Sequence, residues 1–323
     1  MEISLVLSVL FSAQLSSAYP VSLRLEDVFI SVKTSGKFHK TRLTPILETW
    51  FQTAPEQTWF FTDSEDPGLN LRTGGHLINT GCPADHSRTA LSCKMEAELT
   101  EFLKSEKSWF CHVDDDNYLN ARSLVKILAK YTPEKDWYLG KVSIPQPLEI
   151  LDRLVLPTQR KVRFWFATGG AGFCLSRSMA EKMRPWIDNG QFQKLADEIR
   201  LPDDVTVGYI SEVLLQVPLE QVPQFHSHLE PLRLVSHPET EITLSYSQYE
   251  DSGEMNLVEL DGGNDIKENI QNDETMFYAV HCKLYPRSCS TPQTLSWIMQ
   301  YTVNYILDHV VHCKLYPRSC STS

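Results

Sequence analysis

The sequence predicts an α/β domain in which one central sheet is covered by helices on both faces. Apolar strand-like segments alternate with amphipathic helix-like segments from residue 25 onward, and the connections between them are short. Hydrophobic residues make up 42% of the 323 residues and charged residues 22%, close to the average of globular domains. The chain is therefore apolar enough for a large core, in one domain or two.

Four segments have the β-branched and aromatic composition of strands. They cover residues 25–34, 58–63, 108–113 and 137–143. A proline-rich loop follows the fourth segment. It leads to a further buried segment, 164–176, which is split by glycines.

Helices are expected between the strands, at residues 36–52, 87–107, 120–131 and 176–187. Pro45 is acceptable in the first helix only if it falls in the first turn. The second helix carries Glu and Lys pairs, which we expect on its exposed face. Asn120 is the candidate N-cap of the third helix, and Ser176 or Ser178 that of the fourth.

The charge balance excludes one class of partner. Acidic residues outnumber basic ones by 41 to 30, which gives a formal net charge of −11 at pH 7. Sequence-independent binding of nucleic acid requires a basic surface, so we expect no nucleic-acid partner. The chain also has no Gly-x-Gly-x-x-Gly motif between a strand and a helix, and no P-loop motif.

The N-terminus is typical of a secreted protein. Residues 3–11 form an apolar run that is shorter than the roughly 20 residues of a membrane span. With the small residues at 16–18, this run predicts a cleavable signal peptide, so residues 1–18 are expected to be a signal-like segment. A buried N-terminal strand or helix is the alternative.

The eight cysteines agree with a secretory route. An even number behind a signal-like segment favours an oxidising compartment. Eight cysteines allow about 105 pairings, so spacing alone leaves the connectivity open.

The C-terminus contains a duplication. The twelve residues VHCKLYPRSCST occur at 280–291 and again at 311–322. We therefore expect the main domain to span 19–291 and residues 292–323 to be an appended tail. The acidic stretch 250–274 predicts a solvated loop within the domain.

The strongest chemical signal is WFCHVDDDNY at 109–118, where an apolar strand runs into three consecutive aspartates. In open α/β sheets, ligands bind beyond the carboxyl ends of the strands. Along an extended chain, Asp114 and Asp116 point to one side and Asp115 to the other. Such a cluster favours a hard cation such as Mn²⁺ or Mg²⁺, which commonly bridges carboxylates and substrate phosphates. The alternative is a helix N-cap, for which one aspartate would suffice.

Two further motifs carry polar side chains. Asp203 and Asp204 in LPDDVTVGYI precede a helical stretch and are either helix caps or a second acidic site. His226 and His228 in FHSHLE share one side of an extended segment, a spacing that suits imidazole ligands, with a structural role as the alternative. The glycine-rich run at 167–173 would let a ligand approach the backbone.

In this order, the motifs resemble the fringe family, the β-1,3-N-acetylglucosaminyltransferases that extend O-linked fucose. The resemblance covers residues 25–291, and the second VHCKLYP copy has no counterpart in the family. The matching stretches are DVFISVKTSGKFHKTRL, ETWF, FFTD, HSRTALSCKM, WFCHVDDDNY, FWFATGGAGFCLSRSMA, IRLPDDVTVGYI, FHSHLE, ITLSY and the first VHCKLYP.

The resemblance implies a glycosyltransferase A-type α/β domain, with a mixed central sheet covered by helices. It implies inverting transfer of N-acetylglucosamine from UDP-GlcNAc, with Mn²⁺, to O-linked fucose on EGF-like repeats of Notch-type receptors. It also implies residence in the Golgi. Family members usually begin with a membrane anchor, whereas the apolar run here is short, so secretion is the alternative.

The resemblance also assigns roles to individual residues. Asp116 and His228 match the manganese ligands, and Asp115 and Arg42 match residues that contact the donor. Asp204 matches the catalytic base. The cysteine spacing resembles family disulfides that pair Cys82 with Cys93, Cys111 with Cys174 and Cys282 with Cys289.

Two other functions stay open at this stage. One is a related β-1,3-glycosyltransferase with another donor or acceptor. The other is a secreted sugar-binding homologue without activity.

Overall fold

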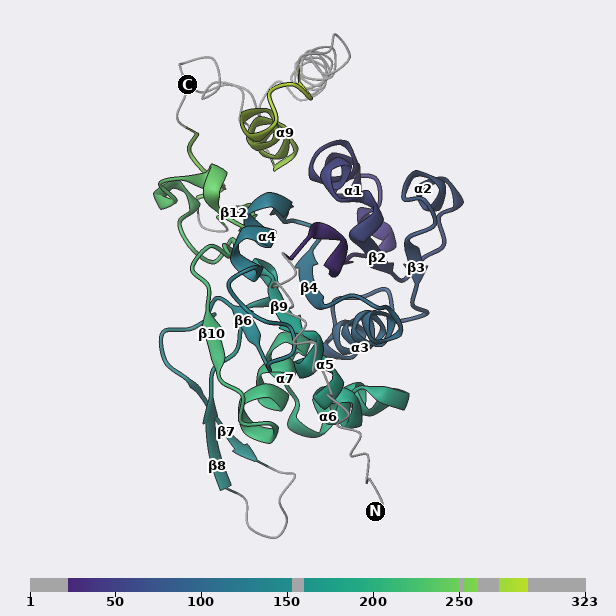
Figure 1. Cartoon of the computed structure of the whole chain (residues 1–323), viewed down its shortest axis with the longest axis vertical. Coiled ribbons are helices and arrows are strands. Elements are labelled where there is room, and N and C mark those ends of the chain that lie inside the picture. The colour runs from purple at the N-terminus through teal and green to yellow at the C-terminus, as the bar shows by residue number, and fades with distance from the viewer. Residues whose placement is uncertain (1–22, 153–159, 250–251, 261–272, 290–323) are drawn as a thin grey trace, which may run out of the picture.

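The central sheet is built around two parallel neighbours, β1 (Val28–Lys33) and β4 (Trp109–Asp114), in a computed structural model of the chain (Figure 1). The structure describes residues 23–152, 160–249, 252–260 and 273–289. The other strands of this sheet are β2 (Thr58–Thr62), β3 (Leu77–Asn79), β6 (Tyr138–Gly140), β9 (Phe173–Ser176) and β10 (Leu219–Gln221). Their order is β10–β6–β9–β4–β1–β2–β3. Strand β9 is antiparallel to both neighbours and the other pairings are parallel, so the sheet is mixed, as expected.

Helices cover both faces of the sheet, as the sequence predicts (Figure 1). One face packs on α3 (Arg88–Lys104), α5 (Arg177–Met183), α6 (Gln191–Ile199) and α7 (Asp203–Gly208). The other packs on α1 (Leu43–Glu48), α2 (Pro67–Arg72), α4 (Ala121–Leu128) and α9 (Asp273–Leu284). Strand β1 serves both cores, because Ile30 and Val32 point to one face and Phe29 to the other.

Three two-stranded pairs complete the described structure. Strand β5 (Tyr118–Leu119) pairs with β11 (Thr243–Leu244), and β12 (Ser247–Gln248) pairs with β13 (Met255–Asn256). The third is a projecting hairpin of β7 (Leu148–Asp152) and β8 (Arg160–Phe164) (Figure 1). This hairpin lies where the sequence predicts only a proline-rich loop. Most of β8 is exposed, so it lacks the apolar alternation that marks a half-buried strand.

Two helix predictions need correction. The helix expected at 36–52 is broken: only α1 is α-helical, between short turns, and Pro45 lies in its first turn as the proline ring requires. The charges of α3 are not all on its exposed face, because Lys94 and Glu98 are 3% and 0% exposed. The predicted caps Asn120 and Ser176 are confirmed, since each side chain accepts a backbone N–H of the first helical turn.

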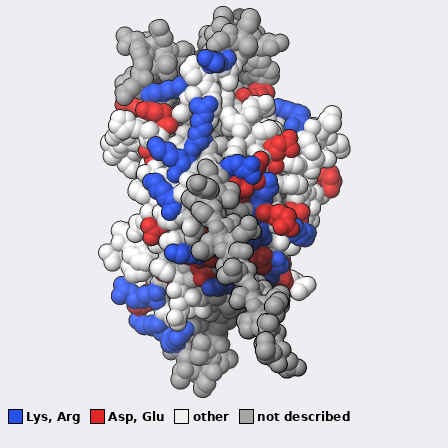
Figure 2. All heavy atoms as spheres, viewed as in Figure 1, with Lys and Arg blue, Asp and Glu red and all other residues white. Residues whose placement is uncertain are grey.

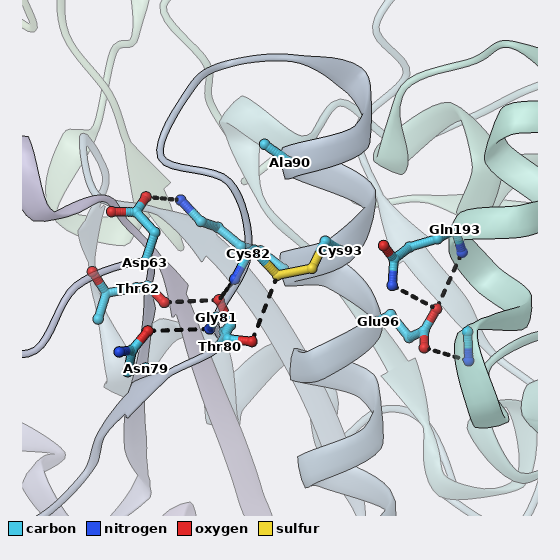
Figure 3. The surroundings of a disulfide bond; sticks show 12 residues. Thr62, Asp63, Asn79, Thr80, Gly81, Cys82, Ala90, Cys93, Glu96 and Gln193 are labelled. Atoms are coloured by element: carbon cyan, nitrogen blue, oxygen red, sulfur yellow. Dashed lines mark hydrogen bonds and ion pairs between the residues drawn. A yellow bond between two sulfur atoms is a disulfide. The ribbon is translucent and has the colours of Figure 1, made fainter.

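The three disulfides implied by the resemblance are present, and the described residues contain no free cysteine. Cys111 and Cys174 are direct partners on the antiparallel strands β4 and β9, so their bond joins the aspartate-bearing strand to the glycine-rich segment. The Cys82–Cys93 bond ties the loop after β3 to α3 (Figure 3). Cys282 and Cys289 close a short loop at the end of α9.

Several sequence predictions fall outside the described residues. They are the signal-like segment 1–18, the tail 292–323 with Cys313 and Cys320, and much of the acidic stretch 250–274. Among the described helices, none has the length and apolar character needed to cross a membrane.

Acidic and basic side chains are mixed over the face seen in Figure 2. Exposed ion pairs among the described residues include Arg88 with Asp197 and Lys161 with Glu149. Exposed pairs contribute little to stability, so the fold depends mainly on its two apolar cores and its disulfides.

We expect replacement of both Cys111 and Cys174 by Ala to lower the free energy of unfolding by roughly 2–5 kcal/mol. The matched control replaces Cys282 and Cys289, which are separated by 7 residues instead of 63 and so close a shorter loop. Denaturant titration should show the larger loss for the Cys111–Cys174 pair. Peptide mapping that finds Cys111 as a free thiol would contradict the assignment.

Candidate active site

A cavity of about 570 Å³ lies at the carboxyl ends of β1 and β4, where open α/β sheets bind ligands. Its walls come from β1 and the residues after it, α3 and the loop before it, and the three aspartates after β4. The glycine-rich segment, the start of α7 and the FHSHLE segment complete them. The five residues to which the resemblance assigns metal, donor or base roles all line it: Arg42, Asp115, Asp116, Asp204 and His228.

The loop that carries the aspartates is fixed by Asn117. Its side-chain oxygen accepts the backbone N–H of Asp114 at 2.9 Å, and its side-chain nitrogen donates to the carbonyl of Gly170 at 2.9 Å. The Trp50 indole donates to the backbone carbonyl of Asn117 at 3.0 Å. These contacts hold the aspartate loop against the glycine-rich segment.

Gly172 allows this close approach. It has a φ of +86°, and a Cβ there would lie 2.7 Å from the carbonyl oxygen of His112. The glycine-rich run therefore serves packing against β4, while Gly169 and Gly170 line the cavity as the sequence suggests.

Arg42 and Asp115 form the wall next to β1. Arg42 Nη1 lies 2.7 Å from Asp115 Oδ1, and Thr34 donates its hydroxyl to Asp115 Oδ2 at 2.7 Å. The guanidinium lies over the ring of Phe38, 3.9 Å from its centre. Burial raises the pKa of Asp115 even though Arg42 opposes the shift. The resemblance assigns both residues to the donor, and in the structure they hold one another in place.

Asp116 and His228 have the properties of two ligands of one cation. Asp116 Oδ2 and His228 Nδ1 are 4.0 Å apart, within the about 4.2 Å that two metal–ligand bonds span. Asp116 Oδ1 and His228 Nδ1 are buried and find no hydrogen-bond partner among the described residues. Burial and the neighbouring Asp114 and Asp115 raise the pKa of Asp116 to about 8, and burial lowers that of His228. A cation would relieve the repulsion at Asp116 and take the neutral imidazole as a ligand.

Asp116 and His228 alone would not complete the coordination of a divalent cation, so further ligands would be required. Within the described residues, no group of three or more His, Cys, Asp or Glu side chains is arranged to hold a metal ion. A divalent cation that keeps open positions for substrate phosphates is compatible with so small a protein ligand set. The residues present therefore fit a cation held jointly with a phosphate-bearing substrate.

His226 is not a ligand, so the structural alternative holds for this residue. Its Nε2 lies 3.0 Å from Glu241 and its Nδ1 3.2 Å from Glu230, and both contacts are with carboxylates. Lys141 also contacts Glu230, at 2.6 Å. Burial alone would lower the pKa of His226, but its bonds to the two glutamates raise it. His226 thus anchors the segment from which His228 reaches the cavity.

Asp204 lines the cavity from the start of α7. Its two carboxylate oxygens accept the backbone N–H of Val205 at 2.8 Å and of Gly169 at 3.1 Å. Burial and the charge of Asp203 raise its pKa to about 6. Gly208 brings the helix close, since a Cβ there would lie 2.4 Å from that of Phe166. A buried carboxylate with a raised pKa is suited to accept a proton near neutral pH.

Asp203 is not a helix cap, contrary to one alternative from the sequence. Its carboxylate lies 2.8 Å from the ammonium group of Lys33, the last residue of β1. Lys33 also lies 3.2 Å from Asp114, its register partner on β4. Burial lowers the pKa of Lys33, but the charges of Asp114, Asp203 and Glu98 outweigh this and raise it.

Sequence reasoning missed Lys33, Glu98 and His112. The structure joins them to the site through Asp114. One signal for Glu98 was available, because it falls at helical spacing from Met95 and Phe102, on the buried stripe of α3. Lys33 could have been found from the pairing of β1 and β4, which places both strand ends at one sheet edge.

A family model described as Fringe-like matches residues 23–288. The chain belongs to the Fringe family. It is 51% identical over 268 residues to the Fringe glycosyltransferase of Drosophila melanogaster, covering 83% of this chain and 64% of that protein. It is 48% identical over 274 residues to the β-1,3-N-acetylglucosaminyltransferase lunatic fringe of Danio rerio, covering 84% of this chain and 72% of that protein. The Fringe resemblance inferred from the motifs is thereby confirmed.

This Fringe protein has the expected architecture, a mixed and mainly parallel sheet between two layers of helices. The prediction of a glycosyltransferase A-type domain is confirmed by this topology together with the family assignment. Mouse xyloside xylosyltransferase 1 is a similar solved structure, with 11% identity and a TM-score of 0.33 over 60% of this chain and 85% of that one. So distant a likeness adds nothing to the assignment.

We expect Asp116→Asn to weaken the binding of Mn²⁺ in the presence of UDP by about tenfold or more, because it removes a negatively charged ligand atom. Electron paramagnetic resonance of the free ion measures this affinity. The matched control is Asp197→Asn, which changes an aspartate on α6 that pairs with Arg88 on the surface. Equal affinity in Asp116→Asn and the wild type would rule out Asp116 as a ligand.

Proposed function

We propose that the chain is an inverting β-1,3-N-acetylglucosaminyltransferase that transfers GlcNAc from UDP-GlcNAc to the 3-hydroxyl of O-linked fucose. The acceptors would be EGF-like repeats of Notch-type receptors. Membership of the Fringe family and similarity to the β-1,3-N-acetylglucosaminyltransferase lunatic fringe support the reaction. The observation that carries the proposal is one cavity that contains Asp116 and His228, whose Oδ2 and Nδ1 atoms lie 4.0 Å apart, and a further carboxylate of raised pKa, Asp204.

Asp116 and His228 would hold the cation, for which Mn²⁺ is the proposed ion. When bound, it would neutralise charge on the diphosphate and so stabilise UDP as a leaving group. Arg42 and Asp115 form the adjacent wall of the cavity and are proposed to contact the nucleotide-sugar.

Asp204 would act as the general base. The 3-oxygen of fucose forms a bond to C1 of GlcNAc while the bond between C1 and the phosphate oxygen breaks. The hydroxyl proton passes to the Asp204 carboxylate, and UDP leaves. One displacement of this kind inverts the anomeric carbon and needs no protein nucleophile. Each cysteine in the described part of the chain is held in a disulfide, so cysteine nucleophiles are excluded there.

We also propose that the catalytic unit is residues 19–291 and that the protein works in the secretory pathway, in the Golgi or after secretion. The disulfide-bonded domain supports an oxidising compartment.

The direct test of the proposed function is an assay of UDP release with Mn²⁺, UDP-GlcNAc and an O-fucosylated EGF-like domain. The expected result is UDP release that requires the fucose and the cation, with a β-linked product by nuclear magnetic resonance. Turnover only with another donor or acceptor would support a related transferase instead. Tight binding of the sugar without turnover would support the inactive homologue.

We expect Asp204→Asn to lower kcat by about 10²–10⁴-fold, because the amide cannot accept the proton. The affinities for UDP and Mn²⁺ should stay within about threefold, since the proposed cation ligands are other residues. Steady-state kinetics and calorimetry measure the two effects. Asp203→Asn should lower kcat by less than Asp204→Asn, because Lys33 keeps its contact with Asp114. The reverse ranking would exchange the roles of the two aspartates.

The pKa of Asp204 predicts how kcat/KM depends on pH. Asp204 works only when deprotonated and its pKa is about 6, so kcat/KM should fall by about tenfold per pH unit below pH 6 and level off above it. A rate that stays flat down to pH 5 would place the base elsewhere.

We expect a chain that ends at Thr291 to keep the fold and activity of the full chain, because residues 292–323 are proposed to be an appendage. Thermal unfolding and the UDP-release assay provide the comparison. A large loss of soluble protein after this truncation would show that the tail is part of the domain.

A further inference from the structure

Five charged side chains of alternating sign make successive contacts, and three of them, Asp114, Lys33 and Asp203, line the cavity. Glu98 Oε2 lies 2.6 Å from His112 Nδ1, and His112 Nε2 lies 3.4 Å from Asp114 Oδ1. Lys33 Nζ lies 3.2 Å from the same oxygen of Asp114 and 2.8 Å from Asp203 Oδ2. We call this series, from Glu98 to Asp203, the buried ion chain.

The inner end of the buried ion chain is inaccessible to water and to substrate. Glu98 and His112 are both 0% exposed, and neither lines the cavity. Burial alone would lower the pKa of His112, but the charge of Glu98 raises it to about 9, so His112 is a cation at neutral pH. Charges attract strongly in this environment, and the loss of one partner leaves the next without compensation.

Glu98 is held firmly on α3. It accepts a hydrogen bond from the hydroxyl of Ser31 on β1 at 2.7 Å. The helix that carries it is tied on one flank by the Cys82–Cys93 disulfide (Figure 3). On the other flank, Glu96 accepts the backbone N–H groups of Gly190 at 2.8 Å and Gln193 at 3.1 Å. The inner end of the buried ion chain is therefore a fixed point.

The outer end reaches both halves of the candidate site. Asp114 is the last residue of β4 and begins the loop that carries Asp116. Asp203 is the first residue of α7 and precedes Asp204. Lys33 touches Asp114 and Asp203, so it bridges the segment of the proposed cation ligand and the segment of the proposed base.

We propose that the Glu98–His112 pair is a positioning element that fixes Asp114 and, through Lys33, sets the base-bearing helix relative to the cation-binding loop. This inference rests on the proposed function. Stability alone is a poor explanation for the pair, because buried ion pairs are often no better for stability than apolar side chains of similar size. A positioning role explains why this charged pair is buried between α3 and the two segments that carry Asp116 and Asp204.

The test is Glu98→Gln, which keeps the size of the side chain and its hydrogen bond with Ser31 but removes the charge. Misplacing catalytic groups by about 1 Å costs up to about 10²-fold, so kcat per folded molecule should fall by about 10- to 100-fold. The affinity for Mn²⁺ with UDP should fall by more than about threefold in paramagnetic resonance, a readout that does not need turnover. Glu98→Asp, which restores the charge, should recover part of both losses.

The matched control is Phe102→Leu. Phe102 lies one turn further along α3 and is fully buried, and its ring contacts are with Phe29, Phe110 and Arg177, outside the buried ion chain. This variant should lower the melting temperature, yet leave kcat and Mn²⁺ affinity within about twofold. If Glu98→Gln does not fold, His112→Gln provides the same comparison from the other partner of the pair.

A double-variant experiment tests whether the two ends of the buried ion chain are coupled in their effect on kcat. Glu98→Gln and Asp203→Asn change its two ends, which share no direct contact in the structure. If the ends are coupled, the loss of kcat in the double variant should be well below the product of the two single losses. Losses that multiply, or a folded Glu98→Gln with wild-type kcat and Mn²⁺ affinity, would overturn the inference. A wild type without transfer would instead overturn the proposed function, and the Mn²⁺ measurement would still test the pair.

Discussion

The contact between Lys33 and Asp114, at the ends of two paired strands, is the interaction on which the rest of the site depends. The parallel pairing of β1 and β4 brings a lysine and an aspartate to the same sheet edge, and burial makes their attraction strong. Because Lys33 also binds Asp203, this one ammonium group connects the start of α7 to the loop after β4. Without it, the carboxylates of Asp114 and Asp203 would repel one another.

The carboxylates of the site are of two kinds, according to how closely a cationic side chain compensates their negative charge. Lys33, His112 and Arg42 each contact two acidic side chains. Asp114 keeps a pKa well below its ordinary value, because Lys33 and His112 outweigh its burial. Burial raises the pKa of Asp115 as well, but Asp115 is paired directly with Arg42 at 2.7 Å. Among the described residues, no basic side chain forms a hydrogen bond with Asp116 or Asp204, and their pKa values are raised. This difference agrees with the proposal that Asp116 binds a cation and Asp204 accepts a proton.

The sequence allowed the fold class, the main strands, two helix caps and the acidic, histidine and glycine motifs of the cavity to be predicted, because apolar alternation and short motifs are local signals. It did not allow the buried ion chain to be predicted. Lys33 and Asp203 are 170 residues apart, and the helical spacing that places Glu98 on the buried face of α3 does not indicate its partner His112. The sequence left Asp203 open between a helix cap and a second acidic site for the same reason, since its partner comes from a distant strand.

The central claim is a division of roles between Asp116 with His228 and Asp204. The most direct measurement is a crystal structure with Mn²⁺ and UDP, in which anomalous scattering locates the ion. The account predicts one manganese peak within coordination distance of Asp116 and His228, with a UDP phosphate as a further ligand and Asp204 outside its coordination sphere. A peak bound to Asp204 or Asp203, or UDP seated with no ion at Asp116, would contradict it.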